Sequence, residues 1–323
     1  MNRTECLHRL WTAAQEGHVL YVREILGPCS RWSTLWQRPG TLKWICRAVL
    51  VAACNDHADV VRELFQHMPD DDVECFTKCA MKRATRCGSL QVVAALLPFP
   101  GSHILVQCGL CPACNHGHAD AVRLLLSAKA DVNRGSDDFP GDAPLRRICG
   151  SSTCSLEILA TLLSAKAEVG ARDGSGPRDL VCLAVSANRP DVVRALAAAK
   201  ADVDARDKVH GNTPLYDAVA CKSLDMVRTL VHVRANVDKV SLQHGFTPIF
   251  GALVIPSAKR KTLRLLVSAK ADVDLEADGL GTPAQFAADS KDVESLRILL
   301  RAKAHVDPQV ARSAVYLAAS DAL

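Results

Sequence analysis

The sequence predicts an all-α solenoid, in which short helical hairpins stack in single file. Two observations predict this fold. Nearly the same phrase, of the kind LLSAKADVD, recurs six times at intervals of 33 to 37 residues, and a fixed period of this length is typical of stacked repeats. Each interval also contains two apolar blocks with helical spacing. The phrases close at Asn133, Gly170, Asp204, Asp238, Asp274 and Asp307.

The unit from Gly211 to Asp238 shows the expected order of elements. Thr213 can cap a first helix, and Pro214 stands at the first helical position, where a missing N–H costs nothing. Apolar residues within 215–219 form one face of this helix, and those within 226–231 form the face of a second helix. A polar, turn-rich link then leads to the next unit.

These motifs resemble those of the ankyrin-repeat family. The openings Thr213-Pro214-Leu215, Thr247-Pro248-Ile249 and Thr282-Pro283-Ala284 fit its Thr-Pro-Leu start, and Gly17-His18 and Gly117-His118 fit its middle motif. The resemblance implies about nine repeats, each with two antiparallel helices and a hairpin-like loop. We expect one continuous solenoid with divergent repeats over 1–104, regular repeats over 105–307 and a capping helix over 308–323.

A basic residue replaces the family's glycine at the end of each second helix. That glycine normally takes a left-handed conformation, which costs another residue on the order of 1 kcal/mol. One interpretation is that a cation at a helix C-terminus recovers about 0.3–1 kcal/mol from the macrodipole. The other is a ladder of positive charges that binds an acidic partner, partly neutralised by nearby carboxylates. The ladder would comprise Lys129, Lys166, Lys200, Arg234, Lys270 and Lys303.

Cys108, Cys111 and Cys114 form the segment closest to a chemical site. Their spacing, with His116 and His118 nearby, is similar to half of a zinc site or to a redox pair. Aligned with the repeat, however, Cys108 takes the place of the opening Thr and Cys114 that of an Ala, so packing as small apolar residues explains them as well. Packing, metal binding and redox chemistry all stay open at this point.

Composition excludes several classes of function. The net charge of +4 is mild, which gives no reason to expect nucleic-acid binding, and no apolar run is long enough to span a membrane. The 14 cysteines follow no compact framework and no secretory signal precedes them, so we expect reduced thiols in a cytoplasmic or nuclear protein. Motifs for phosphate, nucleotide or hydrolytic chemistry are missing, so we expect no enzyme activity and no cofactor.

The resemblance implies that partners bind in a groove lined by first helices and loop tips. Asp217 and Phe286 are the candidates on first helices, Phe286 being an apolar anchor if it does not pack inward. The candidates at the loop tips are long polar side chains: Arg134, Arg172, Asp173, Arg206, Asp207, Lys208, Lys239, Glu276 and Asp278.

The leading hypothesis is therefore a monomeric scaffold or adaptor that binds other proteins, whose identity the sequence does not give. A second hypothesis is a substrate-targeting subunit of an enzyme complex, such as a ubiquitin ligase, with catalysis in another chain. A third is a zinc- or redox-sensing scaffold that uses Cys108, Cys111 and Cys114.

Overall fold

The computed structural model confirms the all-α class. It describes residues 3–27, 41–68, 70–99, 102–135, 142–151, 155–170, 179–243, 245–255, 259–277, 279–305 and 308. Within these ranges every regular element is a helix, apart from an isolated bridge between Ala277 and Gly281. The predicted capping helix lies, after Pro308, outside the described residues.

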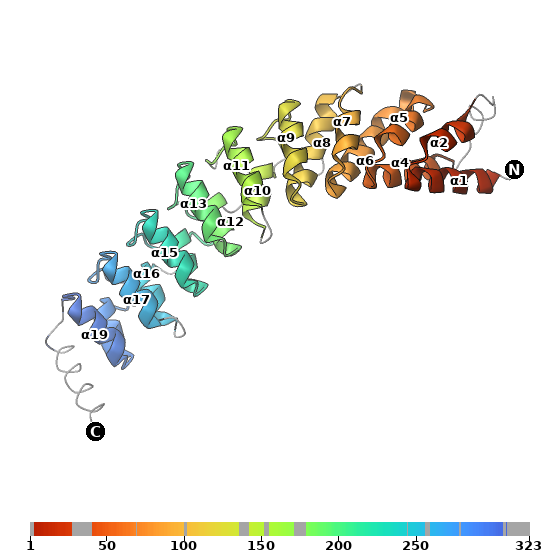
Figure 1. Cartoon of the computed structure of the whole chain (residues 1–323). Coiled ribbons are helices and arrows are strands. Elements are labelled where there is room, and N and C mark those ends of the chain that lie inside the picture. Colours follow the sequence, from red (N-terminus) through yellow and green to blue (C-terminus); the bar gives the residue numbers. More distant parts are fainter. Residues whose placement is uncertain are drawn as a thin grey trace. The chain divides into compact units, whose positions relative to one another are not determined.

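The chain divides into two compact units. Unit 1 is Met1–Ile148 with Thr153–Glu168, and unit 2 is Cys149–Ser152 with Val169–Leu323. In each unit the helices alternate between a first and a second helix of a hairpin (Figure 1).

In unit 1 the first helices α1, α4, α6 and α8 pack on one another in order, and so do the second helices α2, α5, α7, α9 and α11 (Figure 1). Each helix buries its apolar face against the next repeat, so the core is a continuous stripe between the two rows. The helices are α1 (Arg3–Glu16), α2 (Val19–Leu26), α4 (Thr41–Cys54), α5 (Ala58–Gln66), α6 (Asp70–Cys87), α7 (Leu90–Leu96), α8 (Ser102–Asn115), α9 (Ala119–Ser127), α10 (Pro144–Cys149) and α11 (Leu156–Ser164).

Unit 2 has the same arrangement, with α12, α14, α16 and α18 in one row and α13, α15, α17 and α19 in the other. Its helices are α12 (Leu180–Ser186), α13 (Pro190–Ala198), α14 (Pro214–Ala220), α15 (Leu224–His232), α16 (Pro248–Val254), α17 (Lys259–Ser268), α18 (Pro283–Asp289) and α19 (Val293–Arg301).

Four first helices of unit 1 are much longer than those of unit 2, whereas α10 is as short, with 6 residues. Helices α1, α4 and α8 have 14 residues and α6 has 18, whereas α12, α14, α16 and α18 have 7 each. Helix α8 begins at Ser102, before Cys108, the residue that aligns with the opening Thr of the repeat. No Thr-Pro pair stands at this point in unit 1, so the helix continues towards its N-terminus.

Helix capping in unit 2 follows the prediction at two of three Thr-Pro openings. The hydroxyl of Thr213 accepts a bond from the N–H of Tyr216, and that of Thr282 accepts one from Gln285, both at 3.2 Å. Thr247 also precedes its proline, but its hydroxyl oxygen is buried without a hydrogen-bond partner among the described residues.

Candidate protein-interaction surface

All six basic residues of the predicted ladder adopt the left-handed conformation, with φ between 63° and 66°. Each follows a second helix, and its N–H bonds to the carbonyl three residues before it. The next residue is always an alanine, whose N–H bonds to the carbonyl five residues before it. These bonds measure 3.0–3.2 Å, and together they form the helix ending that glycine normally occupies.

The chain therefore has a cation in a strained backbone conformation at six equivalent positions. A left-handed residue with a side chain costs about 1 kcal/mol or more, and the helix dipole returns about 0.3–1 kcal/mol. The two terms nearly cancel, so stability alone gives little reason to prefer lysine over glycine here. The cations instead add a positive charge at the equivalent position in each of these six repeats.

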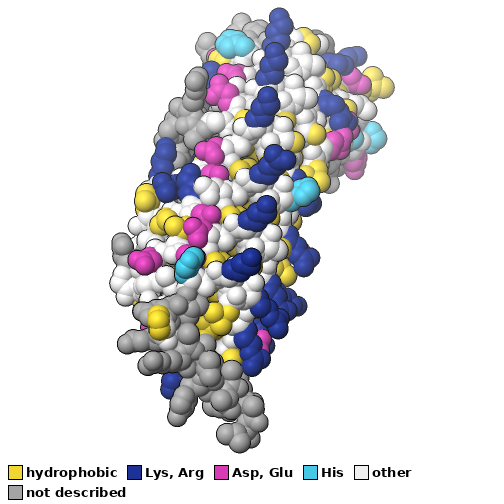
Figure 2. Space-filling model, turned by 90° about the vertical axis from the view of Figure 1, so that its left-hand side faces the viewer, with side chains coloured by type: hydrophobic (Ala, Val, Ile, Leu, Met, Phe, Trp, Pro, Cys, Tyr) yellow, Lys and Arg dark blue, Asp and Glu magenta, His cyan; other side chains and the backbone are white. Residues whose placement is uncertain are grey.

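All six side chains are exposed, and none has an ion-pair partner in the part of the chain that the structure describes. In unit 2 the four of them follow the helices α13, α15, α17 and α19, each of which packs on the next. We call Lys200, Arg234, Lys270 and Lys303 the basic row. Figure 2 shows Lys and Arg side chains following one another in a line, with carboxylates beside them.

The carboxylates beside the basic row hold the repeats together. Oδ1 of Asp204 accepts the N–H of Asn236, and Oδ1 of Asp238 accepts that of Asp272, both at 2.8 Å. Within one phrase, the N–H of Asp274 bonds to Asp272 at 2.9 Å. Burial raises the pKa of Asp238, although the N–H of Asp272 stabilises the carboxylate. The repeated Asp-Val-Asp phrase thus links consecutive repeats by hydrogen bonds.

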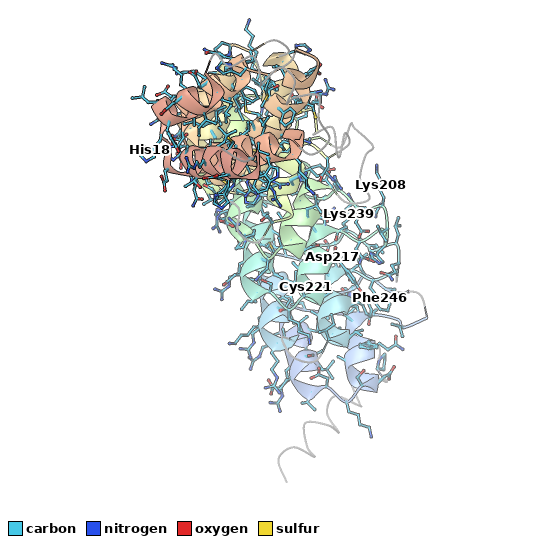
Figure 3. All side chains as sticks on the ribbon, turned by 90° about the vertical axis from the view of Figure 1, so that its right-hand side faces the viewer. His18, Lys208, Asp217, Cys221, Lys239 and Phe246 are labelled. Atoms are coloured by element: carbon cyan, nitrogen blue, oxygen red, sulfur yellow. The ribbon has the colours of Figure 1, made fainter. Side chains whose placement is uncertain are left out.

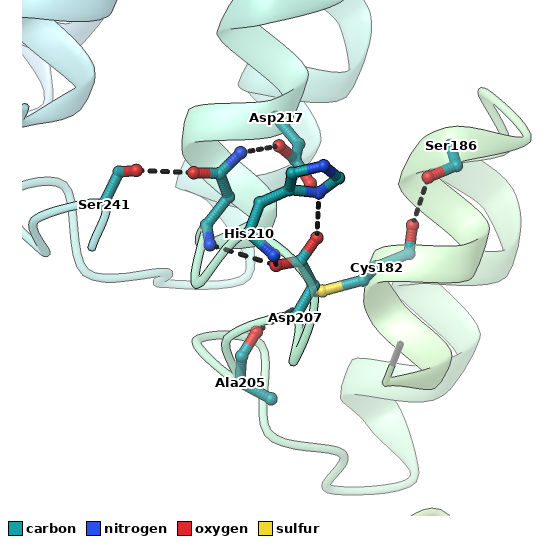
Figure 4. Close-up of polar contacts among 8 residues, drawn as sticks. Cys182, Ser186, Ala205, Asp207, His210, Asp217 and Ser241 are labelled. Carbon is teal, nitrogen blue, oxygen red and sulfur yellow. Dashed lines mark hydrogen bonds and ion pairs between the residues drawn. The ribbon is translucent and has the colours of Figure 1, made fainter. Parts of the chain in front are cut away.

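Asp207 organises a hairpin loop instead of facing a partner. Its carboxylate accepts the N–H groups of His210 and Asn212 and lies 3.2 Å from Nδ1 of His210 (Figure 4). Asn212 in turn bonds to Asp217 at 2.9 Å and accepts the hydroxyl of Ser241 from the next loop. The expectation that Asp207 reaches outward is wrong, because its side chain is only 1% exposed.

Hydrogen bonding keeps Asp207 ionised despite its burial. Desolvation would raise the pKa of this carboxyl group. The bonds from the backbone and ring of His210, and from the N–H of Asn212, outweigh it and leave the pKa below the ordinary value.

Two neighbouring loop tips of unit 2 present apolar and basic side chains together. Val209 is 55% exposed and Leu242 is 67% exposed, beside the exposed Lys208. The loops are joined by a bond from the N–H of Leu242 to the carbonyl of Gly211 at 3.1 Å. Figure 3 shows Lys208 and Lys239 at this edge of unit 2.

Arg206 and Lys239 also bridge loops in unit 2. Arg206 donates to the carbonyl of Val240 at 3.1 Å, and Nζ of Lys239 donates to the carbonyl of Asp204 at 2.8 Å. Lys239 is therefore half-buried, while Arg206 stays exposed. We call the surface of Arg206, Lys208, Val209, Lys239 and Leu242 the tip patch.

The remaining predicted residues fall in three groups. Asp217 is half-buried and engaged by Asn212, and Phe286 is half-buried with its ring 6.0 Å from that of Phe250. Arg134 and Glu276 are exposed. Arg172, Asp173 and Asp278 lie outside the described residues.

The cysteine segment on α8 packs into the core. Cys108, Cys111 and Cys114 are at most 5% exposed, as expected if they act as small apolar residues. Among the described residues, no group of three or more His, Cys, Asp or Glu side chains could hold a metal ion. In the same part of the chain, no helix is both long and apolar enough to cross a membrane.

Family models account for the stacked hairpins. A model of three consecutive ankyrin repeats matches residues 151–241, and a model of a single ankyrin repeat matches residues 113–137. These segments of the chain are ankyrin repeats. Ankyrin repeats generally mediate protein–protein interaction and are typically not catalytic.

Solved structures agree with this assignment at the level of the fold. The chain is similar to the human ASB11 ankyrin repeat domain, with 19% sequence identity and a TM-score of 0.52, over 67% of this chain and 96% of that one. A comparison with curated protein sequences gave no match. The ankyrin fold alone does not select a partner, because 391 chains of known structure resemble this one.

Proposed function

We propose that this ankyrin-repeat protein is an interaction module that binds an acidic segment of another protein along the basic row. The observation that carries the proposal is the uniform placement of four exposed cations in consecutive repeats of unit 2, in a conformation that disfavours them. Charge of one sign at regular intervals favours a partner with the opposite charge at matching intervals.

The spacing of the row favours a helical partner. Second helices that pack on one another lie about 8–10 Å apart, so successive cations of the row recur at about this distance. Carboxylates seven residues apart in an α-helix are separated by about 10 Å along its axis and lie on one face. In an extended strand the carboxylates of one face recur at about 7 Å or about 14 Å, which fits less well.

The tip patch supplies a second contact for the same module. Val209 and Leu242 are large apolar side chains left in solvent, and an apolar centre with a polar rim is typical of a protein-binding surface. A targeting subunit of an enzyme complex could use the same two surfaces, and no described residue favours that role over a scaffold.

The proposal is tested with a fluorescent helical peptide that carries glutamate at every seventh position. The row variant combines Lys200→Glu, Lys270→Glu and Lys303→Glu. The control variant combines Lys222→Glu, Lys261→Glu and Lys291→Glu, which are exposed lysines of unit 2 outside the basic row and the tip patch, and Lys222 and Lys291 are left-handed as well. Both variants change the net charge equally.

We expect the row variant to bind the peptide about tenfold more weakly than the wild-type chain, since several exposed ion pairs are lost at up to about 1 kcal/mol each. The control variant should bind about as the wild type does. An equal loss in both variants, or tighter binding of a DNA duplex than of the peptide, would refute a dedicated site for an acidic protein segment.

A further inference from the structure

Two thiols in unit 1 lie almost within bonding distance. Cys54 ends α4 and Cys87 ends α6, 33 residues further on, and their Sγ atoms are 3.2 Å apart. Both cysteines are unbridged. A disulfide has an S–S distance of about 2.0 Å, so a small rotation of the two side chains could close the gap.

A cation stands beside this pair. Nε of Arg83 donates to Sγ of Cys54 at 2.7 Å. Reactive cysteines commonly have such a neighbour, because the thiolate is the form that attacks. Burial, followed by the hydrogen bond with Cys54, raises the pKa of Cys87, while Arg83 and Arg86 oppose this shift.

The two sulfurs differ in access. Cys87 is exposed, whereas Cys54 is half-buried. An incoming reagent therefore meets Cys87 first and leaves Cys54 in position to complete a bridge. The buried thiols of α8, Cys108 and Cys111, offer no such access.

We propose that Cys54 and Cys87 form a reversible disulfide site that reacts with low-molecular-weight disulfides such as oxidised glutathione. The thiolate of Cys87 attacks one sulfur of the small disulfide, which breaks its S–S bond and releases one small thiol. The thiolate of Cys54 then attacks the sulfur of Cys87 and releases the second small thiol. The protein pair loses two electrons and two protons, and the small disulfide becomes two thiols.

The bridge would join the first helices of two consecutive repeats. Helices α4 and α6 already pack on each other in the reduced protein. Because the bridge links residues 33 apart in the chain, it restricts the unfolded chain. The oxidised protein should accordingly unfold at a higher denaturant concentration than the reduced protein.

The test incubates the reduced full-length chain with oxidised glutathione, blocks remaining thiols by alkylation and maps the peptides by mass spectrometry. We expect the Cys54 and Cys87 peptides to be linked to each other, and a reductant to separate them. Glutathione retained on Cys87 without a bridge, or bridging of Cys87 to a cysteine other than Cys54, would overturn the proposal.

Single serine variants test the order of the two steps. Cys54→Ser should accumulate a mixed disulfide of glutathione on Cys87, whereas Cys87→Ser should react several-fold more slowly at Cys54. Cys221→Ser, which removes an exposed thiol of unit 2, should leave bridging unchanged. Equal reactivity of Cys54 in the wild type and in Cys87→Ser would show that Cys87 is not the entry point. Circular dichroism before oxidation checks that each variant is folded.

Discussion

Oδ1 of Asp238 accepts the backbone N–H of Asp272 at 2.8 Å, and these two residues belong to consecutive repeats of unit 2. The same bond joins Asp204 to Asn236, and Asn133 to Glu168 in unit 1. Because each repeat is incomplete without its neighbour, such bonds fix the register of one hairpin against the next.

Asp238→Ala should therefore lower the free energy of unfolding by about 1 kcal/mol, the usual contribution of one hydrogen bond. Asp238→Asn should change the free energy of unfolding little. Its amide oxygen can still accept the hydrogen bond, and the variant removes a carboxyl group whose pKa is raised by burial. Urea denaturation measures both values. Glu276→Ala, an exposed change in the next loop, serves as the control, and equal losses for Asp238→Ala and Asp238→Asn would contradict the account.

The two Thr-Pro openings at Thr213 and Thr247 make a matched pair. Thr213→Val should cost about 1 kcal/mol, since it removes the cap on Tyr216. Thr247→Val should be neutral or stabilising, because the hydroxyl it removes is buried without a partner among the described residues. Thermal or urea unfolding of the two variants distinguishes them, and a larger loss for Thr247→Val would mean that its hydroxyl is satisfied.

Glu63 makes the stability of unit 1 dependent on pH. Its side chain is 7% exposed and lies 2.7 Å from the guanidinium of Arg23, and this hydrogen bond holds the pKa of Glu63 below its ordinary value despite desolvation. The stabilisation should be complete above the unfolded pKa of about 4.3. It should be lost as the pH falls through the lower folded pKa.

Glu63→Gln should thus be less stable than the wild type at neutral pH by about 1–3 kcal/mol, as for a hydrogen bond to a charged group. The difference should shrink below about pH 4. Asp59→Asn breaks an exposed pair with Arg62 and should have little effect at either pH. A difference between Glu63→Gln and the wild type that does not change with pH would rule out the ion pair as its source.

Leu299 and Leu300 are neighbours on α19 with opposite environments. Leu299 is fully buried, while Leu300 is 38% exposed. Leu299→Ala should cost about 2–5 kcal/mol, as for buried leucines generally, and Leu300→Ala much less. Chemical denaturation measures both, and comparable losses would mean that α19 is packed differently.

The local backbone conformation was predictable from the sequence where the type of a single residue determines it. The left-handed conformation of Lys129 follows from its place in the glycine position, and the cap at Thr213 follows from the Thr-Pro pair. The length of α6 was not predictable in this way. The repeat template begins a first helix at its Thr-Pro pair. That pair is missing before α6, so the template gives no start residue for this helix.

Contacts between repeats were harder to predict. The burial of Asp207 depends on His210 and Asn212 folding back on it, which a polar loop sequence does not reveal. The closeness of Cys54 and Cys87 could have been inferred from their separation of 33 residues, which equals one repeat. For the proposed interaction surface, the sequence indicated the basic positions, and the structure added that no described carboxylate pairs with them.

The most direct test of the central claim replaces Lys200, Lys270 and Lys303 of the basic row by glycine. Glycine suits the left-handed backbone, so the fold is kept while the charge is removed. The measurement is a titration of this variant with the acidic helical peptide, beside the wild-type chain. The account predicts affinity about tenfold weaker in the variant, and unchanged affinity would show that these lysines do not bind an acidic partner.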